Sequence, residues 1–278
     1  MHTLQAIITG TVQGLSEFLP ISSSAHIVFS NELYNLITNT VTVDNQESIF
    51  FDIIVHLGTL LAVVIYFFKD IKTIILNSVI SLKNKDFSNK ELKLAGYIIL
   101  CTFITGIVGL ILKKPTENLI QNPKIICFLL LITGSLLLFG EKLYRGTKDI
   151  SLKSAILIAI AQGLAVFPGF SRSGFTISTA LLTGMDRVKS ARFSFLISIP
   201  VIILASMLYP LIELDLSQIA TFNLKAIFVG FIVSFIVGYY CIKYFMKLLE
   251  KLNLKSFGYY CYFVSIVMFL LFQFVYHQ

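Results

Sequence analysis

Long apolar stretches are the feature that most restricts how this chain can fold. Six of them are long and apolar enough to cross a bilayer, near residues 49–68, 94–112, 125–139, 193–212, 226–242 and 259–276. A transmembrane helix needs roughly 20 mostly apolar residues. Only 13% of the 278 residues are charged and the mean hydropathy is +0.84, which excludes a disordered protein and most soluble enzymes. The sequence therefore predicts an all-α, polytopic membrane protein.

Two further apolar regions, at about residues 4–33 and 154–184, are broken by clusters of Gly, Pro and Ser at 20–24 and 168–173. Each half of such a region is too short to span the bilayer. Non-helical backbone at membrane depth is tolerated only where protein or a wet cavity surrounds it. We therefore expect two re-entrant helix–loop–helix pairs in addition to the six transmembrane helices.

The positions of the basic residues predict an orientation. Most of the 22 Lys and Arg residues fall in four connecting segments that the six spans place on one side, at 69–93, 141–153, 185–192 and 243–257. Lys and Arg collect in cytoplasmic loops, so these segments are expected inside. The first re-entrant pair then enters from outside and the second from inside. The basic cytoplasmic loops account for the net charge of +7, so no nucleic acid is expected as a partner.

The two broken regions resemble each other in sequence. Gln13-Gly14-Leu15 aligns with Gln162-Gly163-Leu164, and the same alignment matches Phe18 with Phe167, Ser22 with Ser171 and Ser24 with Ser173. Because their predicted orientations are opposite, we expect one domain, 1–278, made of inverted repeats at about 1–140 and 150–278. Such repeats place broken helices face to face near the bilayer midplane, with ligand sites between them.

Arg172 is the only Lys or Arg inside a broken region, and a permanent charge facing lipid would be costly. Its guanidinium suits a pair of phosphate or carboxylate oxygens. Glycines and serines around it would let backbone N–H groups approach an anion at a helix start. The candidate anion-binding loop therefore comprises Gly169, Ser171, Arg172, Ser173, Gly174 and Thr176. A purely structural ion pair between Arg172 and Glu17 is the alternative.

In the first broken region, Gln13 and Glu17 are four residues apart and share a helix face. A carboxylate there can bind a divalent cation or act as a general base, with simple solvation as the alternative. His26 follows three serines, and it is a candidate proton carrier or nucleophile or else a packing histidine. Asp52 and His56 lie one turn apart on the first predicted span, and we expect an interfacial or supporting role for them.

Residues 13–26 (QGLSEFLPISSSAH) and 168–176 (PGFSRSGFT) resemble the two signatures of the undecaprenyl pyrophosphate phosphatase family, the bacitracin-resistance proteins. The resemblance extends to 57–64 and 193–196, and the length and segment layout agree over essentially the whole chain. It implies a multi-pass enzyme of the bacterial cytoplasmic (inner) membrane whose site opens to the outer face. Its activity would be metal-dependent removal of the terminal phosphate of undecaprenyl pyrophosphate, which recycles the lipid carrier of peptidoglycan synthesis.

The family pattern makes Glu17, His26 and Arg172 essential, with Ser23, Ser171, Ser173 and Thr176 in support. With the reasoning above, the candidate catalytic residues are Glu17, Ser23, His26 and Arg172, and the candidate substrate-binding residues are Gln13, Ser22, Ser24, Gly169, Ser171, Ser173, Gly174 and Thr176. Glu17 and Gln13 are also the candidate ligands of a divalent metal, Mg²⁺ or Ca²⁺. The chain departs from the family at two positions, where Gln13 replaces a Glu of many members and Ala25 replaces a common Gly.

Several alternatives stay open from the sequence. The attacking group is Ser23, His26 or a water molecule. A lipid transporter or flippase would bind the same phosphate head group without cleaving it, because inverted repeats and broken helices are also transporter features. Beyond the polyprenyl pyrophosphate substrate and membrane lipid, a second copy of the chain in a homodimer is left open as a partner.

Overall fold

The computed structural model describes residues 2–38, 45–120 and 122–275, and within these ranges it contains helices and no strand. The helices are α1 (Thr3–Ser16), α2 (Ser23–Thr38), α3 (Asn45–Tyr66), α4 (Phe68–Lys83), α5 (Lys90–Ile120), α6 (Pro123–Lys142), α7 (Leu152–Leu164), α8 (Arg172–Leu182), α9 (Arg187–Glu213), the 3₁₀ helix η1 (Leu216–Thr221), α10 (Leu224–Leu249) and α11 (Lys255–Val275).

Six helices are long and apolar enough to cross a membrane, which confirms the six predicted spans. They are α3, α5, α6, α9, α10 and α11. Large apolar side chains on their outer faces are exposed, including Phe103 at 67% and Leu110 at 74%. A soluble protein rarely exposes so much apolar surface, whereas lipid covers it at no cost. The chain is therefore a multi-pass membrane protein.

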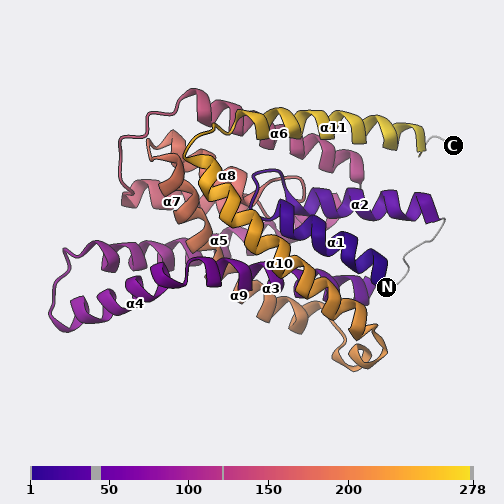
Figure 1. The fold of residues 1–278 in the computed structure, drawn as a ribbon, viewed down its shortest axis with the longest axis horizontal. Coiled ribbons are helices and arrows are strands. Elements are labelled where there is room, and N and C mark those ends of the chain that lie inside the picture. The colour runs from indigo at the N-terminus through magenta and orange to yellow at the C-terminus, as the bar shows by residue number, and fades with distance from the viewer. Residues whose placement is uncertain (1, 39–44, 121, 276–278) are drawn as a thin grey trace.

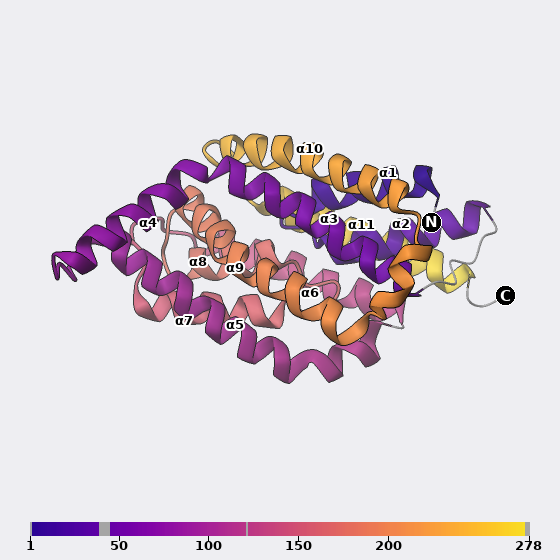
Figure 2. The same cartoon turned by 90° about the horizontal axis from the view of Figure 1, so that it is seen from below.

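The long helices run side by side, and one end of the bundle differs from the other. In both views α4 and the beginning of α5 project from one end, whereas α1 begins and α11 ends at the opposite end (Figures 1 and 2). The segment 69–93, expected only as a basic connection, thus contains most of a helix, α4.

The two regions predicted to be broken are broken in the structure. Residues 17–22 separate α1 from α2, and residues 165–171 separate α7 from α8. These four helices have 14, 16, 13 and 11 residues, so the longest measures about 24 Å at 1.5 Å per residue. That is shorter than the hydrocarbon core of about 30 Å. Each break contains a residue with positive φ, Ser22 at 71° and Gly169 at 101°.

Each half of the chain supplies the partner for the first short helix of the other half. Helix α1 packs along α10, and α7 packs along α5. Glycines allow the α1–α10 backbones to approach closely, since a Cβ on Gly10 would lie 2.8 Å from the Gly230 carbonyl oxygen. Small residues are the usual means of close packing between membrane helices, where no hydrophobic effect drives association.

A cluster of aromatic rings supports the loop that follows α1. Phe18 meets Phe195 of α9 edge to face, with ring centroids 5.5 Å apart, and Phe195 also contacts Phe67 and Phe245, each at 6.2 Å. Edge-to-face pairs at these distances are favourable. The loop that carries Glu17 therefore packs on an aromatic cluster formed by α9, α10 and the junction between α3 and α4.

Gly10→Ala should destabilise the protein. The added methyl group would meet backbone atoms of Gly230, which cannot move aside as a side chain can, and overpacking of this kind costs about 1–3 kcal/mol. Thermal unfolding in detergent measures the change. Gly106→Ala in α5 is the matched control, because a Cβ there meets nothing within 4 Å. Equal melting temperatures for the two variants would contradict the close approach of α1 and α10.

Candidate active site

The loop between α1 and α2 meets the loop between α7 and α8 at an ion pair between Glu17 and Arg172. Glu17 follows the last residue of α1 and Arg172 is the first residue of α8, so the pair joins residues that are 155 positions apart. Nη2 of Arg172 donates to Oε1 of Glu17. The Glu17 side chain is 5% exposed and that of Arg172 is 21% exposed. A buried carboxylate requires such a partner, because an isolated charge is expensive to bury.

The second carboxylate oxygen of Glu17 receives hydrogen bonds from two predicted site residues. Ser23 Oγ, at the start of α2, donates to Glu17 Oε2 over 2.7 Å. Gln13 Nε2, one turn earlier on α1, donates to the same oxygen over 3.1 Å. Gln13 is fully buried, and its Nε2 also lies 3.4 Å from Thr59 Oγ1 of α3. The geometry thus presents a serine hydroxyl directly to a carboxylate base.

The loop before α8 is held in shape by its own serines and by α6. Ser171 caps the helix, accepting a hydrogen bond from the Gly174 N–H at 3.0 Å. Thr133 of α6 accepts from the Ser171 N–H at 3.1 Å and donates to the Gly169 carbonyl at 3.0 Å. Gly169 is required here, because a Cβ would lie 2.6 Å from the Ile126 carbonyl oxygen. The first turn of α8 is therefore held in a fixed geometry, and helix starts of this kind are suited to anions.

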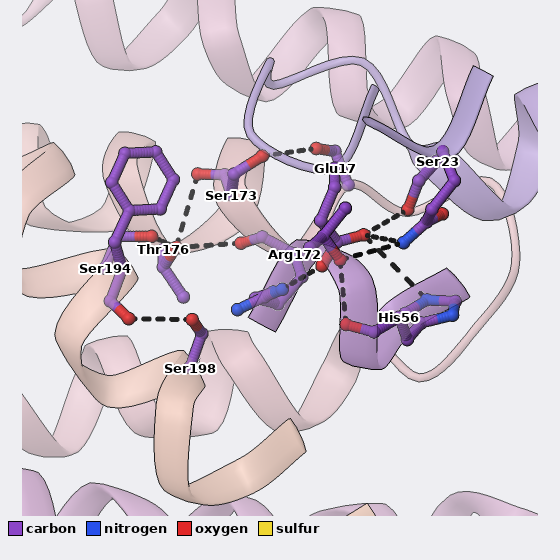
Figure 3. A network of polar contacts seen from close by, with 12 residues as sticks. Glu17, Ser23, His56, Arg172, Ser173, Thr176, Ser194 and Ser198 are labelled. Atoms are coloured by element: carbon purple, nitrogen blue, oxygen red, sulfur yellow. Dashed lines mark hydrogen bonds and ion pairs between the residues drawn. The ribbon is translucent and has the colours of Figure 1, made fainter. Parts of the chain in front are cut away.

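Hydroxyl groups connect the second loop to the first loop and to α9. Ser173 Oγ donates to the Leu19 carbonyl over 3.0 Å, and it lies 3.2 Å from Ser171 Oγ. Thr176 Oγ1 donates to the Arg172 carbonyl over 2.8 Å and pairs with Ser194 Oγ. Figure 3 shows Arg172 between this group of hydroxyls and the Glu17, Ser23 and His56 side chains.

His26 lies outside this network. Its Nδ1 is 2.8 Å from the Ser22 carbonyl oxygen, which can only accept, so Nδ1 carries the proton and Nε2 is the acceptor. The Tyr260 hydroxyl of α11 lies 3.0 Å from Nε2 and therefore donates to it. The two rings are also stacked, with 9° between their planes. Both ring nitrogens of His26 are thus engaged.

His56, expected only in a supporting role, faces Glu17 instead. Its Nε2 is 3.9 Å from Glu17 Oε2. The spacing of Asp52 and His56 on α3 indicated a shared helix face, but not that α1 would lie against it. Tyr260 gave no sequence signal at all, since it lies 234 positions from His26.

The remaining predicted residues are close to the network. Ser22 and Ser24 pair through their hydroxyls at 3.2 Å. The structure thus brings Gln13, Glu17, Ser23, Arg172, Ser171, Ser173 and Thr176 together, and it turns His26 toward α11. Thr59, Thr133, Ser194 and Tyr260 were not anticipated as members of the site.

The residues at Glu17 fit a hard divalent cation. Gln13 Oε1 is buried and has no hydrogen-bond partner, which is unusual for a buried polar atom. Amide and carboxylate oxygens are the ligands that Mg²⁺ and Ca²⁺ prefer. Within the described ranges no group of three or more His, Cys, Asp and Glu side chains forms a metal centre. A cation here would therefore have few protein ligands, as is usual where a phosphate substrate supplies the others.

These features define a multi-pass membrane protein with a buried serine–carboxylate–arginine site between two broken helices. The family model described as "Bacitracin resistance protein BacA" matches residues 6–267. The chain belongs to this family, which confirms the resemblance seen in the sequence.

Curated relatives agree over nearly their full lengths. The undecaprenyl-diphosphatase of Methanosphaera stadtmanae is 39% identical over 282 residues, covering 96% of this chain and 97% of the relative. That of Methanobrevibacter smithii is 37% identical, covering 97% and 98%. Undecaprenyl-diphosphatase 2 of Halalkalibacterium halodurans is 36% identical, covering 98% and 97%.

Thr133→Val should loosen the anion-binding loop without changing the shape of the side chain. It leaves the Ser171 N–H and the Gly169 carbonyl without their partner, and a lost buried hydrogen-bond partner costs about 1–3 kcal/mol. We expect a lower unfolding temperature and faster hydrogen exchange at the Ser171 amide. Thr133→Ser retains the hydroxyl and should behave as wild type. Unchanged exchange in Thr133→Val would rule out this role for Thr133.

Proposed function

We propose that this protein hydrolyses undecaprenyl pyrophosphate to undecaprenyl phosphate and inorganic phosphate, which recycles the lipid carrier for peptidoglycan synthesis and gives bacitracin resistance. Family membership and the names of the relatives support the reaction. The observation that carries it is the contact of Ser23 and Arg172 with the two oxygens of one buried carboxylate, Glu17. A flippase would need the anion-binding half of this arrangement but no activated hydroxyl.

Arg172 and the start of α8 bind the diphosphate. A guanidinium has five N–H donors, and the ion pair with Glu17 engages Nη2. The other donors can hold phosphate oxygens, together with the backbone N–H groups of the first turn of α8 and the hydroxyls of Ser171 and Ser173. Donors fixed before the substrate binds stabilise the charge that develops in the transition state.

Ser23 is the attacking group and Glu17 is its base. Ser23 Oγ forms a bond to the terminal phosphorus as the bridging P–O bond breaks, and Glu17 Oε2 accepts the hydroxyl proton and passes it to the leaving lipid monophosphate. Water then attacks the phosphoserine, Glu17 takes a proton from it, and that proton returns to Ser23 Oγ as inorganic phosphate leaves. The 2.7 Å hydrogen bond between Ser23 and Glu17 supports this assignment.

His26 is a less suitable nucleophile, because its Nε2 accepts from Tyr260 and its Nδ1 donates to Ser22. His26 instead orients the serine turn at the start of α2. Glu17 and Gln13 hold a divalent cation, Mg²⁺ or Ca²⁺, which when bound would offset the negative charge of the diphosphate.

Both broken regions are re-entrant in this proposal, and the halves 1–140 and 150–278 are inverted repeats within a single domain. The reciprocal packing of α1 on α10 and α7 on α5 supports the repeat. The basic segments at 69–93, 141–153, 185–192 and 243–257 lie on the cytoplasmic side of the inner membrane. The site then opens to the outer face, and the polyprenyl chain remains in the lipid.

Arg172→Ala should abolish most phosphate release. Loss of one preorganised donor typically costs 10²–10³-fold in kcat, and this change also leaves Glu17 without its counter-ion. Purified protein in detergent, supplied with the pyrophosphate lipid, gives the rate, and circular dichroism reports folding. The exposed Arg145 in the loop after α6 provides the control, Arg145→Ala, which should retain wild-type activity. Normal release by folded Arg172→Ala would refute the assignment.

A phosphoserine should form during turnover. Substrate labelled in its terminal phosphate, mixed rapidly with enzyme and quenched in acid, should leave label on Ser23, because a phosphoserine survives acid and a phosphohistidine does not. Ser23→Ala should carry no label. In a parallel quench in base, label that survives base but not acid would identify a phosphohistidine in place of a phosphoserine. The absence of label after both quenches during rapid turnover would favour direct attack by water.

A further inference from the structure

His56 has the arrangement of a metal-ligating histidine. Its Nδ1 lies 2.7 Å from the Asp52 carbonyl oxygen. Because a carbonyl only accepts, Nδ1 carries a proton, and in the neutral imidazole the lone pair is then on Nε2. Histidines that bind metals almost always donate their other N–H in this way, which fixes both the tautomer and the ring orientation. The free lone pair of His56 faces Glu17 Oε2 at 3.9 Å, the side of the carboxylate away from the Arg172 contact on Oε1.

The Gln13 amide is the second part of this arrangement. Gln13 is fully buried, its Nε2 is 3.1 Å from Glu17 Oε2, and its Oε1 has no partner. Rotating the amide by 180° would exchange the two atoms and place Oε1 about where Nε2 is now. Two oxygens about 3 Å apart match adjacent ligands of an octahedral cation with bonds near 2.1 Å. Without a cation, the rotated amide would place two acceptor oxygens, Gln13 Oε1 and Glu17 Oε2, next to each other. The rotated orientation is therefore suited to a bound cation.

We propose that His56 Nε2 is a third protein ligand of the divalent cation, beside Glu17 Oε2 and Gln13 Oε1. The inference rests on the proposed function, because it concerns the same site. Closing the 3.9 Å separation to the roughly 3 Å expected of adjacent ligands requires a shift of about 1 Å in one side chain. Substrate oxygens and water fill the remaining positions.

A mixed set of one imidazole and two oxygens changes which metal the site favours. Imidazole suits first-row transition metals, whereas Ca²⁺ and Mg²⁺ prefer oxygen ligands alone. Position 13 is Gln13 in this chain, where many family members have a Glu, so the site has one carboxylate fewer. The neutral Nε2 of His56 supplies a ligand in place of the missing carboxylate oxygen. The imidazole ligand therefore raises the affinity of the site for first-row transition metals relative to Ca²⁺.

His26 provides the contrast within the same protein. Its Nε2 accepts from the Tyr260 hydroxyl at 3.0 Å, so it has no lone pair to offer. His56, in contrast, is 35% exposed and lines a cavity of about 350 Å³ between α3 and α9, together with Asp52, Ile202 and Ser206. His56 thus borders open space, whereas both ring nitrogens of His26 are occupied.

The test is Mn²⁺ binding to the purified, substrate-free protein. Electron spin-echo spectroscopy of bound Mn²⁺ should show coupling to a histidine ¹⁴N, and labelling the protein with ¹⁵N-histidine should change the coupling accordingly. In His56→Gln the coupling should disappear and the Mn²⁺ affinity should fall 10–100-fold. Ca²⁺ affinity, measured by competition, should change less than threefold.

His26→Gln is the matched control, and it should retain the coupling because both nitrogens of His26 are already engaged. Wild-type protein that binds Mn²⁺ without nitrogen coupling would overturn the proposal, and this readout needs no variant to fold. Coupling that persists in His56→Gln would overturn it as well. Neither result depends on turnover, so the assignment of His56 and the phosphatase reaction can fail separately.

Discussion

The buried ion pair between Glu17 and Arg172 is the interaction on which the rest of the site depends. Burying two charges is costly, and a well-packed apolar pair would often be as stable. The pair is therefore weak evidence for stability, and its place in the proposed reaction gives it a different role. Each charge also commits the protein to a geometry, because neither loop can move away without leaving the other charge alone in a site of low polarity. The Ser173–Leu19 hydrogen bond and the Thr133 contacts hold the loops in that geometry.

The two broken helices contribute different chemistry to one site. The first supplies a base and a hydroxyl, Glu17 and Ser23, and the second supplies a cation at a capped helix start. Each loop alone would be incomplete, since the base would lack its counter-ion and the anion-binding turn would lack an attacking group. If the two halves are inverted repeats, as proposed, their copies can diverge in this way because they face each other and only their sum is needed.

Much of the fold and of the candidate site could be predicted from the sequence, because the signals come from residues close together in the chain. Hydropathy identifies the long helices, Pro20 and Gly169 mark the breaks, and the spacing of Gln13 and Glu17 puts them on one face. Which of the two histidines faces Glu17 could not be predicted in this way. Whether His26 or His56 faces Glu17 depends on how α2, α3 and α11 pack around α1, and that is set by contacts such as His26–Tyr260 between residues 234 positions apart. Helical spacing gives the face of a residue but not the neighbour that the face meets.

The packing of α1 against α10 has a consequence for how the protein is made. Helix α1 is synthesised long before its partner α10, which begins only at Leu224. Until α10 is made, the Gly10 face of α1 lacks the neighbour that it has in the folded protein. Glu17 lacks its counter-ion until Arg172 is made. The contacts of α1 are therefore completed only when residues 224–249 have been synthesised. The candidate site is thus assembled only after segments from both halves of the chain have been made.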